Sequence, residues 1–188
     1  MKNELIKMNI FVLDNDPVKA AQYMDCVRVP KMCVESAQMM ASALRRYGAT
    51  DDIMPLTQKN TPYKGGYHHH PCTIQSGNSL EDFMWLANHA VALCYEYTMR
   101  FNKVHACQKP IIHMKQVIEG KHNGIRFTPD WDYDSKTPFA QAMPDEYKDV
   151  DAVKAYRAYY KSKADSKGGV HYRHVSAPDW WQGVEVTV

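Results

Sequence analysis

The sequence lacks several features that would assign it to a known class at once. It has no run of 18 apolar residues, and its first eight residues contain no long apolar segment, so we expect neither a membrane-spanning helix nor a signal peptide. Its five cysteines include no CxxC pair, which favours reduced thiols over a disulfide framework. It has no internal repeat and no low-complexity segment. We therefore expect a soluble, cytoplasmic protein with no membrane partner.

An excess of charge of one sign is also missing. The net charge is +2 and the pI is about 8.2, so any case for a nucleic-acid partner depends on local patches. The 188 residues, 45% of them hydrophobic, are enough for one domain with a real core. We predict a single domain over residues 1–188, with residues 1–8 as a flexible N-terminal extension and residues 170–188 as a C-terminal tail.

Helical patterns account for most of the chain. N-cap residues, prolines in first turns, glycines after last turns and apolar periodicity mark the helices. The predicted helices cover residues 16–26, 28–48, 79–103, 110–119 and 150–165. Residues 9–13 form either a lone strand or an extended lead-in, and residues 50–78 and 121–147, rich in glycine and proline, are long loops. These pieces predict a mainly α, single-domain helical bundle with long loops.

The predicted helix at residues 28–48 has a narrow polar stripe on an otherwise apolar surface. Pro30 suits its first turn, and Gly48 suits its C-terminal end. The stripe follows helical spacing and consists of Lys31, Glu35, Gln38, Ser42 and Arg45. Either this stripe simply touches water, with Lys31 and Glu35 as an ordinary i,i+4 pair, or it borders a cleft.

Lys31 and Glu35 are the first candidates for chemistry. A lysine against apolar walls loses part of its preference for the charged form, and its neutral amine can attack an electrophilic carbon to form a Schiff base. A carboxylate one turn away can take up or return the proton. Many helices contain a lysine and a glutamate at this spacing, so the spacing alone does not establish a catalytic pair. The hypothesis also requires that both side chains border one cleft in the folded chain.

Three consecutive histidines occupy residues 68–70. Their side chains point in different directions and no HExxH accompanies them, so we expect no metal and no cofactor. We expect one histidine, His70 being the candidate, to contact a ligand or cap the following helix, and the others to be exposed. A metal-dependent hydrolase that uses His89, His105 or Cys107 is an alternative.

The predicted last helix is the most basic segment of the chain. Residues 150–169 contain five basic residues and two acidic ones, interleaved with tyrosines. Basic side chains bind phosphates, and tyrosine rings stack on bases. Arg157 and Lys161 are the candidate DNA contacts here, whereas a solvated helix with its tyrosines in the core is the alternative.

Several motifs together resemble a family of small, mostly uncharacterised bacteriophage proteins. They are NIF at 9–11, DNDP at 14–17, KM at 31–32, ESAQ at 35–38, HPC at 70–72, Trp85 with His89, EYT at 96–98, MPDEY at 143–147 and WW at 180–181. This resemblance implies a phage setting, in the cytoplasm of an infected bacterium, but no reaction.

A second resemblance is to the phage pyrimidine-dimer DNA glycosylases of the endonuclease V type. RVPKM at residues 28–32 resembles the family's helix segment with an LPR core, and His70 lies ahead of a long helix, as in the family. AYRAYYKSKA at residues 155–164 resembles the family's C-terminal aromatic and basic run. The resemblance implies an all-helical fold, a double-stranded DNA partner, a flipped nucleotide, attack on the sugar C1′ by an amine, and a glutamate on the LPR-bearing helix.

This sequence departs from that family in two respects. The family attacks with its N-terminal α-amine, whereas this chain has a longer N-terminus, in which Met1 precedes the bulky Lys2. Where the family has its glutamate, two residues before the proline, this chain has Arg28. If the chemistry persists, Lys31 replaces the amine and Glu35 replaces the acid.

These considerations predict a DNA glycosylase/lyase that acts on a damaged or modified pyrimidine through a lysine amine. A glycosylase-like transferase that modifies thymine bases in phage DNA and a non-catalytic nucleic-acid-binding protein are the alternatives. The expected catalytic residues are Lys31, Glu35 and His70. The expected substrate contacts are Arg28, Gln38, Trp85, His89, Arg100, Arg157 and Lys161.

Overall fold

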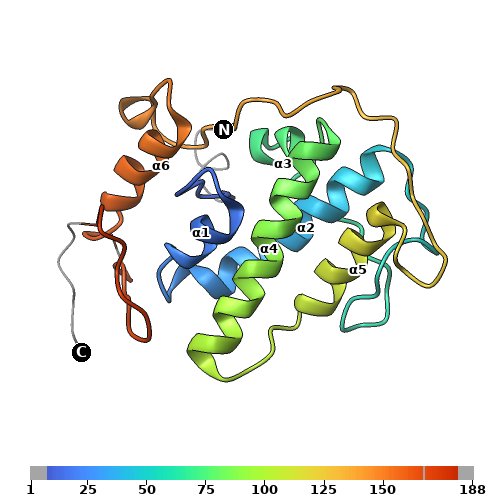
Figure 1. The fold of residues 1–188 in the computed structure, drawn as a ribbon, viewed down its shortest axis with the longest axis horizontal. Coiled ribbons are helices and arrows are strands. Elements are labelled where there is room, and N and C mark those ends of the chain that lie inside the picture. The colour runs from blue at the N-terminus through green and yellow to red at the C-terminus, as the bar shows by residue number, and fades with distance from the viewer. Residues whose placement is uncertain (1–7, 167, 182–188) are drawn as a thin grey trace.

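The computed structural model describes residues 8–166 and 168–181, and these residues form helices joined by long loops (Figure 1). The helices are α1 (Pro17–Gln22), α2 (Arg28–Arg46), α3 (Pro71–Gln75), α4 (Leu80–Phe101), α5 (Gln108–Glu119), the 3-10 helix η1 (Asp145–Tyr147) and α6 (Ala152–Lys161). Within this part of the chain no β-strand forms, and residues 9–13 are the extended lead-in. The prediction of a mainly α fold is confirmed.

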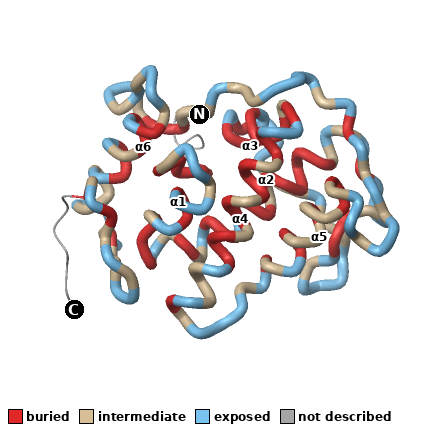
Figure 2. Tube along the Cα trace, viewed as in Figure 1, coloured by how far each residue is buried: buried red, intermediate tan, exposed pale blue. Residues whose placement is uncertain are grey.

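The central element is α4, which runs diagonally through the molecule with α1, α2 and α5 packed against it (Figure 1). It begins at Ser79, whose hydroxyl accepts the Asp82 N–H, and it ends at Asn102 in the left-handed conformation. The neighbouring helices cover α4 on more than one side. Buried residues are concentrated in these central helices, whereas much of the connecting loops is exposed (Figure 2). None of the helices described is long and apolar enough to cross a membrane.

Several predicted boundaries differ from the structure. α1 ends at Gln22, about one turn early, because the chain turns there into the joint that precedes α2. α3 lies inside a predicted loop, since its five residues are too short to show a helical period. Two apolar residues on the long helices, Val34 of α2 and Leu80 of α4, are 41% and 47% exposed. The five cysteines are free and buried, as expected of reduced thiols.

The polar stripe of α2 is largely covered rather than open to water. Glu35 and Ser42 are only 6% and 2% exposed. Ser42 exchanges hydrogen bonds with the backbone of Gly66 at 2.8 and 2.9 Å. Gly65 has φ +81° and lies so close to Ser42 that a side chain on it would collide, so a glycine is required there. The loop over residues 63–66 thus covers the C-terminal half of the stripe and leaves only its Lys31 end near a pocket.

A buried carboxylate organises the joint between α1 and α2. Asp25 is fully buried, and its Oδ1 accepts from the Tyr160 hydroxyl at 2.5 Å and from Arg28 Nη1 at 3.1 Å. Its Oδ2 accepts the backbone N–H groups of Val27 and His171, each at 3.1 Å. One side chain therefore fixes the start of α2, the inner face of α6 and the C-terminal segment at the same time.

A buried histidine gives the fold a marked sensitivity to acid. His89 has no exposed surface, its Nδ1 lies 2.9 Å from the Pro17 carbonyl, and burial lowers its pKa to about 4. Between pH 6.5 and 4 the unfolded chain takes up a proton at this site that the folded chain does not, so the free energy of unfolding falls as the pH falls. We expect His89 to account for about 3 kcal/mol of that loss.

Urea unfolding of the wild type and His89→Gln at several pH values measures this contribution. The stability difference between the two proteins should shrink steadily from pH 6.5 to pH 4. His69→Gln, which changes an exposed histidine, should follow the wild type throughout. Stability curves of His89→Gln and wild type that run parallel over this pH range would contradict the assignment.

Asp25 is expected to contribute more to stability than any single partner does. Asp25→Ala leaves the Arg28 guanidinium without its carboxylate in a half-buried position and should cost about 3–5 kcal/mol. Tyr160→Phe removes only one hydroxyl and should cost about 1 kcal/mol. Because both changes break the same bond, the double variant should be less destabilised than the sum of the two, as measured by urea unfolding. Strict additivity would show that the bond contributes little.

Candidate functional site

A pocket of about 200 Å³ lies beside the N-terminal end of α2. It is bordered by the N-terminal segment, by the start of α2 and by the C-terminal end of α6, which the joint at Asp25 holds together. Its lining residues are Asn9, Phe11, Val27, Arg28, Lys31, Tyr159, Lys163 and Ser166. Three of these side chains are cations and none is an acid. Larger hollows near residues 133–140 and 139–150 are lined by none of the three expected catalytic residues.

Lys31 and Glu35 form an ion pair at the wall of this pocket. The distance from Lys31 Nζ to Glu35 Oε1 is 3.1 Å, and the two side chains are 60% and 8% exposed. The second carboxylate oxygen, Oε2, accepts the backbone N–H of Asn9 at 2.9 Å. The carboxylate is therefore fixed by the backbone on one oxygen, while the lysine that contacts its other oxygen lines the pocket and is largely exposed.

Burial raises the pKa of Glu35 above its ordinary value of 4.5. The N–H of Asn9 and the charges of Lys31 and His70 act in the opposite direction, since each stabilises the carboxylate. The thiol of Cys72 lies on the same side, and burial together with the charge of Glu35 raises the pKa of Cys72 to about 12. A glutamate in such a setting can accept a proton more readily than an exposed one.

His70 lies at the start of α3, close enough to affect the carboxylate of Glu35. It is buried, and its Nδ1 accepts the N–H of Cys72 at 3.2 Å as the N-cap of the helix. His68 and His69 are exposed, so the prediction of one capping histidine and two exposed ones is confirmed. The structure thus places Lys31 and His70 near the one carboxylate of Glu35.

Arg28 lines the pocket, and neighbouring groups of the protein hold its guanidinium in place. Its Nη1 donates to Asp25 Oδ1 at 3.1 Å and to the Gly169 carbonyl at 3.0 Å, and the group lies 5.3 Å from the centroid of the Tyr160 ring. The side chain is 12% exposed. Arg28 is therefore a fixed cation that combines a structural role with a place at the pocket.

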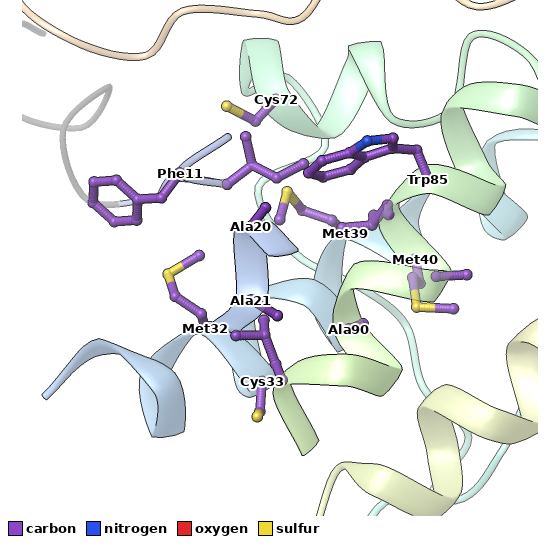
Figure 3. Packing of buried hydrophobic residues seen from close by; sticks show 14 of the residues in the cluster. Phe11, Ala20, Ala21, Met32, Cys33, Met39, Met40, Cys72, Trp85 and Ala90 are labelled. Carbon is purple, nitrogen blue, oxygen red and sulfur yellow. The ribbon is translucent and has the colours of Figure 1, made fainter. Parts of the chain in front are cut away.

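Three of the expected substrate contacts on α4 are instead part of the protein interior. Trp85 donates to the Asn15 carbonyl at 2.7 Å and stacks on His89. Among the buried side chains drawn in Figure 3, Phe11 lies at the left and Trp85 at the right, near Met39. Arg100 is 4% exposed and binds Glu96 at 2.7 Å and the Met24 carbonyl at 2.5 Å, near the end of α1. None of the three lines the pocket.

The remaining expected contacts also lie outside the pocket lining. Gln38 is half-buried on α2, further along the helix than Glu35. Arg157 donates to the Leu13 carbonyl at 2.8 Å and pairs with Asp14 at 3.2 Å. Lys161 is exposed at the end of α6, and Lys167 of the same basic run lies outside the described residues.

Sequence reasoning missed several residues that line the pocket. Tyr159 and Lys163 lie four residues apart in the basic run, a spacing that places them on one helical face, yet nothing in the sequence pairs them with Lys31. Phe11 has φ +47°, a conformation that is unusual for a bulky residue, and the side chain of Asn9 accepts the Phe11 N–H at 3.0 Å. No local pattern reveals this turn.

The arrangement does not suggest a metal centre. In residues 8–166 and 168–181 no group of three or more His, Cys, Asp or Glu side chains is placed to hold a metal ion. His89 and His105 are both committed to the protein's own backbone, His105 through the N–H of Cys107 at 3.1 Å. What the pocket offers is three cations, one of which, the Lys31 amine, is paired with the buried carboxylate of Glu35.

Comparison with known proteins assigns the chain to a family. The sequence profile of the pyrimidine dimer DNA glycosylase family matches residues 8–109, which is more than half of the 188 residues. No curated protein and no solved structure matches the chain. The matched range contains Lys31, Glu35 and His70, whereas α6 follows it. This chain belongs to the pyrimidine dimer DNA glycosylase family.

Proposed function

We propose that the protein is a DNA glycosylase with an associated lyase step, which acts on a damaged or modified pyrimidine in double-stranded DNA. The nucleophile is the Lys31 amine, Glu35 is the acid/base, and the target nucleotide leaves the base stack to reach them. The observation that carries the proposal is the Lys31–Glu35 contact of 3.1 Å on the wall of a cationic pocket. The resemblance to phage proteins supports the cytoplasm of an infected bacterium as the setting.

The reaction follows from the order in which proton and electron pairs move. Glu35 takes a proton from the Lys31 ammonium, and the neutral amine attacks C1′ of the target nucleotide. The glycosidic C–N bond breaks with its electron pair on the base, which takes the proton from Glu35 as it leaves. The Lys31 nitrogen, now bonded to C1′, gives a proton to Glu35, its electron pair forms the C=N bond of a Schiff base, and the C1′–O4′ bond breaks with its pair on O4′, which takes up that proton. Glu35 then takes a proton from C2′, and the C3′–O bond breaks with its electron pair on the leaving phosphate, which cuts the strand.

The groups around Lys31 favour the transfer of its proton to Glu35 and the binding of DNA. The raised pKa of Glu35 brings its proton affinity closer to that of the amine, so the transfer from Lys31 costs less. Arg28 and Lys163 contribute positive charge that favours a polyanionic substrate. His70 lies close to the carboxylate and limits how far its pKa rises.

A second candidate function is DNA binding without chemistry. The observation that favours it is the exposure of Lys31, since a lysine side chain that is 60% exposed is accessible to a phosphate of the DNA backbone. In that case the pocket recognises the DNA backbone, and the family's reaction is lost. The two functions differ in whether a covalent protein–DNA intermediate forms.

Borohydride trapping tests the proposed nucleophile. Incubation with duplex DNA that contains an abasic site or a pyrimidine dimer, followed by borohydride, should reduce the Schiff base to a stable amine and give a covalent protein–DNA adduct. Lys31→Ala should lose the adduct by at least about 10²-fold, because no other amine takes its place. The adduct is measured by its retarded migration on a denaturing gel.

Two variants control this experiment. Lys154→Ala changes an exposed lysine that pairs with Asp149 away from the pocket, and it should trap as the wild type does. A wild-type protein that binds such DNA but never traps would support the binding function instead. Trapping that persists in Lys31→Ala would assign the nucleophile to another amine.

The rate of trapping should depend on pH through Glu35. Because burial raises the pKa of this carboxyl, the acid limb of the rate profile should lie above pH 4.5, where an exposed glutamate would already be ionised. Glu35→Gln should remove that limb and lower the rate by about 10²-fold at neutral pH. Glu119→Gln changes a glutamate whose pKa is lowered by Lys115, and it should leave both the rate and the limb unchanged. A limb that survives in Glu35→Gln would exclude Glu35 as the base.

A further inference from the structure

The segment at the end of α6 completes the pocket from outside the range that the family profile matches. Tyr159 and Lys163 both line it, and both follow residue 109, where the match ends. Lys163 Nζ donates to the Tyr159 hydroxyl at 2.7 Å and lies 4.1 Å from the centroid of the Tyr159 ring. The family assignment therefore says nothing about these two side chains, although they line the same pocket as Lys31.

The three cations of the pocket differ in what neutralises them. Arg28 faces Asp25 at 3.1 Å, and Lys31 faces Glu35 at 3.1 Å. Lys163 has a phenol oxygen as its partner, and among the residues that the structure describes no carboxylate lies within ion-pair distance of it. An ammonium group has three donors, and the tyrosine uses one. Of the three cations, Lys163 thus retains the most capacity to bind an anion.

The Lys163 ammonium is also held in place before any ligand arrives. Its partner Tyr159 stacks on Phe11, with ring centroids 6.2 Å apart and planes 20° apart. The backbone carbonyl of Lys163 accepts the Ser166 hydroxyl at 2.7 Å. α6 itself is fixed through the bond between Tyr160 and Asp25. A cation ordered in this way loses little further freedom when it binds.

We propose that Lys163 binds a backbone phosphate of DNA, the one next to the nucleotide whose C1′ faces Lys31, and that Tyr159 orients its ammonium group. This inference rests on the proposed function and deepens it, because it gives the pocket a phosphate contact as well as a nucleophile. Lys161, two residues earlier, is exposed and does not line the pocket, so it has no such role. A phosphate held at Lys163 fixes the sugar beside the amine.

The experiment measures binding without chemistry. Duplex DNA with a tetrahydrofuran abasic analogue has no aldehyde and no base to release, so it cannot form a Schiff base. Its affinity, and that of the same duplex without the analogue, are measured by fluorescence anisotropy over a range of salt concentrations. Lys163→Ala should bind the analogue duplex about fivefold more weakly at 0.15 M salt and should reduce the salt slope by about 0.9, as loss of one phosphate contact requires.

Three variants make the result specific. Lys163→Arg keeps the charge and should restore the salt slope. Tyr159→Phe keeps the ring and removes the hydroxyl, so it should weaken binding without changing the slope. Lys161→Ala is the matched control, at the last residue of α6 and two residues before Lys163, and it should leave the ratio of the two affinities unchanged, whereas Lys163→Ala should lower that ratio.

The inference is overturned if Lys163→Ala leaves both the affinity ratio and the salt slope as they are, or if Lys161→Ala lowers the ratio as much. Equal affinity of the wild type for the two duplexes overturns it as well. Failure of the proposed reaction gives a different result. If the wild type forms no borohydride-trapped adduct but Lys163→Ala still lowers the affinity ratio and the salt slope, the lyase reaction is excluded and the phosphate site stands.

Discussion

The bond network of Asp25 is the constraint on which the pocket depends. Its two oxygens accept from Tyr160 and Arg28 and from the N–H groups of Val27 and His171, so four donors satisfy one fully buried carboxylate. A buried charge is tolerated only when it is paired and hydrogen-bonded in this way. Because the donors come from α2, α6 and the C-terminal segment, the network joins residues more than 130 positions apart in the chain. The pocket is the space left where these segments meet.

The two buried carboxylates near the pocket, those of Asp25 and Glu35, have different roles. Asp25 is surrounded by donors of the protein itself and faces Arg28, so its charge is used in holding the elements together. Glu35 has one oxygen anchored by the N–H of Asn9, and its other oxygen contacts the Lys31 amine. Asn9 in turn fixes the turn at Phe11 through its side chain. The same short segment thus shapes the pocket wall and buries the carboxylate, which is why the pKa of Glu35 is raised.

The sequence was sufficient for the parts of the structure that depend on local patterns. The long helices α2 and α4 have strong periods and clear end signals, and the contact of Lys31 with Glu35 follows from their i,i+4 spacing on α2. Trp85, His89 and Arg100 lie within the predicted helix at residues 79–103, but a helical pattern cannot show that other helices cover α4 on that side. Tyr159 and Lys163 could not be paired with Lys31, because contacts across such a separation arise only in the folded chain.

The departure from the family at residue 28 becomes understandable in this setting. A carboxylate at that position would lie beside Asp25, and two buried acids in contact repel each other and resist ionisation. Arginine instead neutralises Asp25 and adds a cation to the pocket. The acid that the reaction needs then has to come from elsewhere, and Glu35, about two turns further along α2, contacts the amine of Lys31. In the proposed reaction, the nucleophile is on α2 instead of at the N-terminus, and the base lies further along the same helix. Arg28, in place of an acid, pairs with Asp25 and keeps the joint between α1 and α2 closed.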